Sequence, residues 1–87
     1  MKNENKIKVL GELTNKQEVI QKIVNLVENE KMLGVFLVKT GVEDKPYEIR
    51  VLSKTIHVIF YCDNAGVAIT CGKELAADLG TTFKQIP

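Results

Sequence analysis

The sequence predicts an α+β domain with a mixed, mainly antiparallel sheet of about five strands, one long helix and one short helix. Three observations predict this class. β-Branched and aromatic residues concentrate between Tyr47 and Cys71, an apolar stripe with helical spacing precedes them, and a short helical pattern that ends at Gly80 follows them. The predicted order of elements is β-α-β-β-β-β-α, and a further edge strand through Phe83 is optional.

Two strands are expected on either side of the long helix. Residues 1–5 are predicted to be a flexible tip, and residues 6–87 a single globular domain. Ile7 and Val9 alternate with their neighbours in the period of two that is typical of a strand. Residues 33–40 are apolar on both faces, which indicates an interior strand. A strand, a helix and a second strand favour a parallel pair joined by a right-handed crossover.

The long helix has a recognisable start and an apolar face. Thr14 or Asn15 can cap it, and each is followed three residues later by Gln17 or Glu18, the partner that a capping box needs. Its stripe is wide enough to cover one face of a sheet, and consists of Val19, Ile20, Ile23, Val24, Leu26 and Val27.

The central region predicts three antiparallel strands, over residues 47–52, 56–62 and 67–71. Two-residue loops at Lys54-Thr55 and Asn64-Ala65 place on one face the pairs Val51 with Val58, Ile49 with Phe60, Cys62 with Val67, and Phe60 with Ile69. Two alternatives stay open. The first loop lacks the Gly or Asn of a tight hairpin and is compatible with a wider loop or a bend. The second is compatible with a type I turn and a bulge at Gly66, which would exchange the faces of the last strand.

The opposite face of this sheet is a mixture of polar and apolar side chains. It carries Glu48, Arg50, Leu52, His57, Ile59 and Tyr61, together with Ala68 and Thr70. If both helices cover the other side, this face stays partly exposed, and an apolar centre with a polar surround is typical of protein-binding surfaces. If the helices take opposite faces, nothing is left exposed. We take the six residues from Glu48 to Tyr61 as the candidate partner-binding set.

The composition restricts the function classes. Apolar residues make up 45% of the 87-residue chain, which excludes a disordered protein, and the formal charge of +1 argues against nucleic acid as the main partner. No apolar run has the roughly 20 residues of a membrane span and no signal-peptide core appears, so we expect a cytoplasmic protein without a membrane partner. Cys62 and Cys71 are expected to be buried free thiols. No metal or cofactor motif is found, and none is expected to bind.

Three groups of residues have a chemical interpretation beside a structural one. His57 can act as a general base if a partner and a pocket exist, or is a partly covered histidine with a local hydrogen bond. Arg50 and Glu48 can bind an anionic ligand or a partner, or merely pair with each other. Gly72 and Lys73, at the predicted start of the short helix, can hold a phosphate, although no Gly-rich loop precedes them.

The segment from Lys39 to Thr70 resembles the C-terminal half of the RelE/HigB-type toxins, small α/β ribonucleases of toxin-antitoxin pairs. The residues that carry the resemblance are Tyr47 to Val51, Ile56 to Tyr61, and an apolar strand at Val67 to Thr70. The resemblance implies a ribonuclease or a degenerate relative. Three departures oppose that activity: there is room for one helix where the family has a helical hairpin, His57 stands where an arginine is common, and a basic tail is missing.

These observations predict a small non-enzymatic interaction protein that binds a protein partner through the mixed sheet face or associates with itself. Richness in Lys, Asn, Ile and Glu is typical of bacteria and phages of low G+C content, and an inhibitor from a phage or mobile element would fit the size. The alternatives are the toxin-type ribonuclease and an oligomer that sequesters a small molecule.

Overall fold

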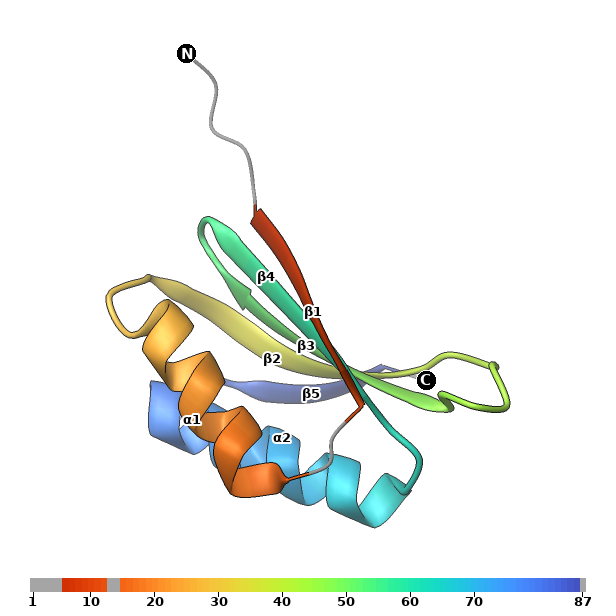
Figure 1. Cartoon of the computed structure of the whole chain (residues 1–87). Coiled ribbons are helices and arrows are strands. Elements are labelled where there is room, and N and C mark those ends of the chain that lie inside the picture. The colour runs from red at the N-terminus through yellow and green to blue at the C-terminus, as the bar shows by residue number, and fades with distance from the viewer. Residues whose placement is uncertain (1–5, 13–14, 87) are drawn as a thin grey trace.

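The computed structural model describes residues 6–12 and 15–86. Their elements, in chain order, are β1 (Lys6–Glu12), α1 (Lys16–Val27), β2 (Met32–Lys39), β3 (Tyr47–Ser53), β4 (Ile56–Cys62), α2 (Ala65–Leu79) and β5 (Phe83–Ile86) (Figure 1). The α+β class, the mixed five-stranded sheet and the presence of two helices are confirmed, but the helix that was predicted to be short, α2, has 15 residues and is longer than α1 with 12. The predicted flexible tip, residues 1–5, lies outside the described residues.

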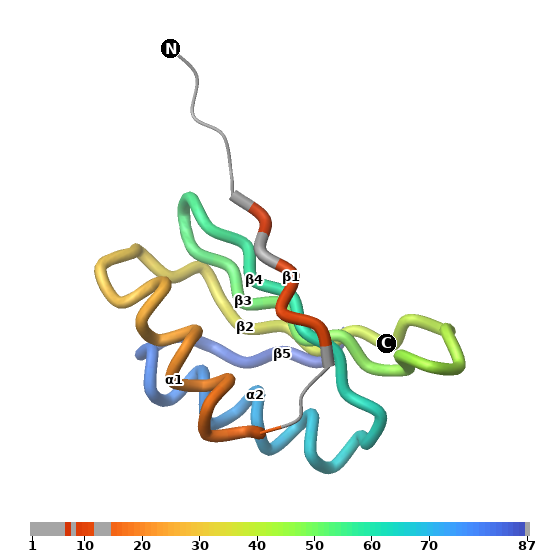
Figure 2. Tube along the Cα trace, in the orientation of Figure 1, coloured from red at the N-terminus to blue at the C-terminus, as the bar shows by residue number. Residues whose placement is uncertain are grey.

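The strands form one sheet in the order β1-β4-β3-β2-β5. The central strand β3 is antiparallel to both of its neighbours, whereas the edge strands β1 and β5 are parallel to β4 and β2 respectively. β1 and β2 therefore run in the same direction, as the crossover predicts, but they do not pair, because β4 and β3 lie between them (Figure 2).

The hairpin of β3 and β4 has the predicted register. Val51 pairs with Val58 and Ile49 with Phe60, and the connection is the two-residue loop Lys54-Thr55. A side chain compensates for the missing turn glycine, because the hydroxyl of Ser53 accepts a hydrogen bond from the backbone N–H of Ile56 at 2.8 Å. The alternative of a wider loop or a bend is thereby excluded.

The predicted strand over Val67 to Cys71 is wrong, because these residues form the first half of α2. Asn64 caps this helix: its side-chain oxygen accepts a hydrogen bond from the N–H of Val67 at 3.0 Å. The proposed pairs of Val67 and Ile69 with β4 do not exist. The buried residues of α2 are spaced at three and four positions, as one helix face requires, and are Ala68, Cys71, Gly72, Leu75 and Ala76. β5 supplies the fifth strand instead.

The other helix boundaries follow the predicted signals. Of the two candidate caps of α1, Asn15 accepts a hydrogen bond from the N–H of Glu18 at 3.1 Å, and Thr14 lies outside the described residues. α2 ends at Leu79, and Gly80 caps its C-terminus. The φ of Gly80 is 66°, the left-handed conformation that glycine adopts without a steric penalty.

The core lies between one face of the sheet and both helices. Its buried side chains come from all three central strands and from both helices, and are Ile20, Ile23, Val27, Val35, Leu37, Ile49, Val51, Val58, Phe60, Cys62, Ala68, Cys71, Leu75 and Ala76. Both cysteines are buried and free, as predicted, although Cys71 is on α2 and not on a strand. Since the two helices also contact each other, they form one layer on this side of the sheet (Figure 1).

Candidate interaction surface

The face of the sheet opposite the helices is not covered by any element of residues 6–12 and 15–86 (Figure 1). The interpretation in which the helices take opposite faces is therefore wrong. Because side chains alternate along each strand, the residues between the buried ones project to this side. We call it the open face. Its members are Ile7, Val9, Phe36, Val38, Glu48, Arg50, Leu52, His57, Ile59, Tyr61, Lys84 and Ile86.

All six predicted partner-binding residues lie on the open face. They form three cross-strand pairs between β3 and β4, namely Leu52 with His57, Arg50 with Ile59, and Glu48 with Tyr61. Leu52, Ile59 and Tyr61 are half-buried by their neighbours in the sheet. Ala68 and Thr70, which were expected beside them, are on α2 instead.

The outer strands also contribute to the open face, which the sequence pattern did not predict. On β1, Ile7 and Val9 stand beside His57 and Ile59, and their side chains are 64% and 57% exposed. On β5, Ile86 is 45% exposed. The alternation of Ile7 and Val9 indicated that both lie on the same face of a strand. Which face of the sheet this is depends on the strand that pairs with β1, and the sequence does not reveal that strand.

β2 contributes two further apolar side chains. Phe36 is opposite Arg50 and Val38 is opposite Glu48 in the antiparallel register. The Phe36 ring lies against Gly34, where a Cβ atom would be 2.9 Å from the ring carbon Cζ. Alternation along the apolar run 33–40 separates these residues from buried Val35 and Leu37, and this signal was present in the sequence.

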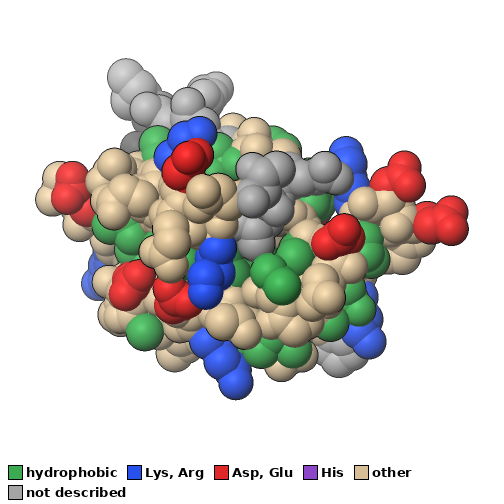
Figure 3. All heavy atoms as spheres, turned by 60° about the horizontal axis from the view of Figure 1, so that its bottom comes forward, with side chains coloured by type: hydrophobic (Ala, Val, Ile, Leu, Met, Phe, Trp, Pro, Cys, Tyr) green, Lys and Arg blue, Asp and Glu red, His purple; other side chains and the backbone are tan. Residues whose placement is uncertain are grey.

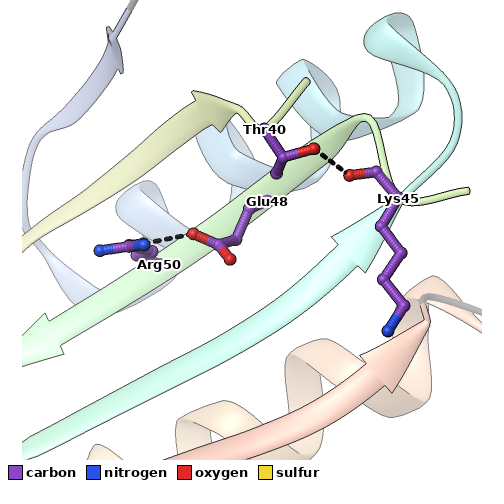
Figure 4. A network of polar contacts seen from close by, with 4 residues as sticks. All are labelled: Thr40, Lys45, Glu48 and Arg50. Atoms are coloured by element: carbon purple, nitrogen blue, oxygen red, sulfur yellow. Dashed lines mark hydrogen bonds and ion pairs between the residues drawn. The ribbon is translucent and has the colours of Figure 1, made fainter. Parts of the chain in front are cut away.

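An ion pair occupies the middle of the open face. The Nε atom of Arg50 donates a hydrogen bond to Oε1 of Glu48 at 2.5 Å, between residues two apart on the central strand (Figure 4). Glu48 is only 9% exposed, so its carboxylate depends on this partner. At the end of the face, the ammonium group of Lys45 lies 4.9 Å from the centre of the Tyr61 ring, a cation–π contact. The loop that carries Lys45 is closed by a hydrogen bond from the Thr40 hydroxyl to the Lys45 carbonyl oxygen.

His57 has no partner for catalysis among the described residues. Its Nε2 atom is buried without a hydrogen bond, so the local bond of the structural interpretation is not formed at this atom. Burial lowers the pKa of His57 below its usual 6.5, the positive charge of Arg50 lowers it further, and Glu48 opposes both. Glu48 bonds to Arg50 instead of orienting the imidazole. The neutral ring is therefore a half-buried part of the open face.

The helix side carries several separate hydrophobic patches. Charged side chains interrupt its hydrophobic patches (Figure 3). A hollow of about 410 Å³ lies between α2 and the β2–β5 edge, lined by Leu37, Lys39, Tyr47, Ala65, Ile69, Gln85 and Ile86. Gly72 and Lys73, considered as a phosphate-binding helix start, are inside α2, where the backbone N–H groups are already bonded within the helix.

Neither described helix is long and apolar enough to cross a membrane. Within the described ranges, no three His, Cys, Asp or Glu side chains gather as a metal site would require. No family model matches the sequence, and no curated protein matches it. The resemblance to the RelE/HigB-type toxins stays a prediction, and one of the three segments that carry it, Val67 to Thr70, is helical and not a strand.

Proposed function

We propose that this protein is a non-enzymatic interaction protein and that it binds another protein molecule through the open face. One observation carries the proposal: both helices lie on the same side of the sheet, so that five strands present their other side uncovered by the described elements. This face carries exposed Ile7, Val9 and Ile86 together with half-buried aromatic rings. Apolar side chains that gather on an exposed surface are typical of protein-binding sites.

The arrangement of the open face matches the anatomy of protein interfaces. Phe36, Leu52, Ile59 and Tyr61 supply aromatic and aliphatic contact area, and Arg50 is of the type that is enriched at such surfaces. The buried Glu48 neutralises Arg50, so the centre of the face carries no net charge. Nucleic acid, which is bound through clusters of unpaired Lys and Arg, is a poor fit to this centre.

A photo-crosslinking amino acid tests the proposal. Replacing Ile59 on the open face with p-benzoylphenylalanine should give covalent protein adducts on irradiation, in the purified protein or in expressing bacteria. The matched control replaces Lys73, which is exposed on α2, and should give none. Adducts from position 73 and none from position 59 would contradict the proposal, and the folded state of both variants is checked by circular dichroism.

A further inference from the structure

We infer that the partner of the open face is a second copy of this chain, packed face to face as a two-fold symmetric dimer. The inference rests on the proposed function and names the molecule that is bound. It follows from the order of residues across the three central strands, which makes the open face complementary to itself.

Two rows of side chains cross the sheet side by side. The register places Phe36, Arg50 and Ile59 in one row, from β2 through β3 to β4. The adjacent row, two residues along each strand, contains Val38, Glu48 and Tyr61. Each row has an apolar residue on β2, a charge on β3 and an apolar residue on β4, and the two charges have opposite sign.

A two-fold axis between the rows, parallel to the sheets and perpendicular to the strands, exchanges these rows. The first row of one copy then lies over the second row of the other. Arg50 faces Glu48 of the second copy, Phe36 faces Val38, and Ile59 faces Tyr61. Two sheets that pack in this way keep their strands about 30° from alignment and about 10 Å apart, so the match is best at the central strand.

Electrostatics selects this axis over the alternative. An axis parallel to the strands and centred on β3 would place Arg50 over Arg50 and Glu48 over Glu48, which brings like charges together. The selected axis extends the ion pair within each chain into a ring of four alternating charges. An interface around such an axis is isologous, because each contact occurs twice. The formal charge of +1 per chain adds little long-range repulsion between copies.

The area of the open face sets the expected affinity. Five strands about 4.8 Å apart and about six residues long, at about 3.4 Å per residue, span roughly 500 Å² on each copy. Stable interfaces bury about 800 Å² per partner. We therefore expect a dissociation constant in the micromolar range, with a monomer at low concentration and a dimer at high concentration.

Charge reversal tests both the contact and its symmetry. In analytical ultracentrifugation, the wild-type chain should shift from monomer to dimer as its concentration rises. Glu48→Arg and Arg50→Glu should each be at least about 30-fold weaker in self-association, since each places like charges over one another. An equimolar mixture of the two variants should form a heterodimer, and the double variant should regain the homodimer. The control Lys73→Glu, on α2, should associate like wild type.

Crosslinking provides a second test if the charge-reversal variants do not fold. The p-benzoylphenylalanine variant at position 59 should crosslink to a peptide of the same chain that contains Tyr61, because these positions face each other in the dimer. Crosslinking to a peptide of α1 or α2 of the second copy would overturn the face-to-face arrangement.

The outcomes separate this inference from the proposed function. A wild-type chain that stays monomeric at high micromolar concentration, while position 59 crosslinks to a different protein, overturns the dimer and leaves the proposed function standing. A monomer whose position 59 crosslinks to no protein overturns both. A dimer that Glu48→Arg and Arg50→Glu leave unchanged uses another surface and also overturns the inference.

Discussion

The Phe83 ring on β5 lies against Gly72 in the middle of α2. A Cβ atom at Gly72 would be 2.2 Å from the ring carbon Cε1 and 2.8 Å from Cδ1. Gly72→Ala adds helix propensity worth about 1 kcal/mol, but a contact this short forces the ring or the strand to move, and overpacking costs about 1–3 kcal/mol. We expect a net loss of about 1 kcal/mol in the free energy of unfolding, measured by urea denaturation.

A double-mutant cycle identifies the cause of that loss. Phe83→Ala removes the ring, so Gly72→Ala introduced into this background should stabilise the protein, as a helix substitution without a clash does. If Gly72→Ala destabilises both backgrounds equally, the contact with Phe83 is not the reason.

The N-cap of α2 should contribute measurably to stability. Asn64→Ala removes the acceptor for the N–H of Val67, and loss of such a cap costs about 1 kcal/mol. Asn64→Ser retains a capping oxygen and should stay close to wild type. Urea denaturation of both variants measures the difference, and equal loss in both would show that the side chain is not needed as a cap.

The stability of the fold should fall as the pH decreases below 6.5. Burial and Arg50 lower the pKa of His57 in the folded state, so below the unfolded value of 6.5 the unfolded chain binds more protons than the folded chain. The contribution of His57 is fully present above pH 6.5 and is lost as the pH falls toward the lowered pKa. His57→Gln should remove this part of the pH dependence.

The proton NMR titration of His57 gives an independent check of that sign. His57 is the only histidine of the chain, so its ring signal needs no assignment by mutagenesis. A folded-state midpoint above 6.5 would contradict the prediction.

Cys71 should be unreactive in the folded protein. The thiol is fully buried, and burial raises its pKa from 9.0 to about 11, which reduces the thiolate fraction about 100-fold at neutral pH. In a Cys62→Ser variant, which leaves Cys71 as the single thiol, labelling by a disulfide reagent should be slow and should accelerate when urea unfolds the chain. Rapid labelling without urea would show that the thiol is accessible.

Local patterns were sufficient for the central hairpin. Alternation in β3 and β4, with a two-residue loop, fixed the pairs Val51 with Val58 and Arg50 with Ile59, because a shift of one residue would expose the buried set. The same register placed the six candidate residues on one face. Their role in binding stays a prediction, which the crosslinking and association measurements above address.

The first half of α2 was not predictable from local propensity. Val67, Ile69 and Thr70 are β-branched and favour a strand, whereas the structure makes them helical. The signal for a helix was the run of small and apolar residues at helical spacing from Ala68 to Ala76, which continues across the expected boundary at Gly72. Packing of that face against the core outweighs the weaker strand preference.

Local sequence patterns also did not determine the order of the strands in the sheet. The crossover through α1 predicted the direction of β1 and β2 but not that β4 and β3 separate them. This order decides that Ile7 and Val9 lie beside His57 and Ile59. The residues of the outer part of the open face were therefore not predictable from the sequence pattern.

The pairing of β1 with β4 has a consequence for how the chain matures on the ribosome. Lys6 is paired with Ile56 and Glu12 with Tyr61, so β1, which is synthesised before β4, has no hydrogen-bonding neighbour among the described strands until β4 has emerged from the exit tunnel. The β3–β4 hairpin, with its two-residue loop, closes early, and β1 is added late at an edge of the sheet. During that interval the backbone N–H and C=O groups of β1 have no strand partner.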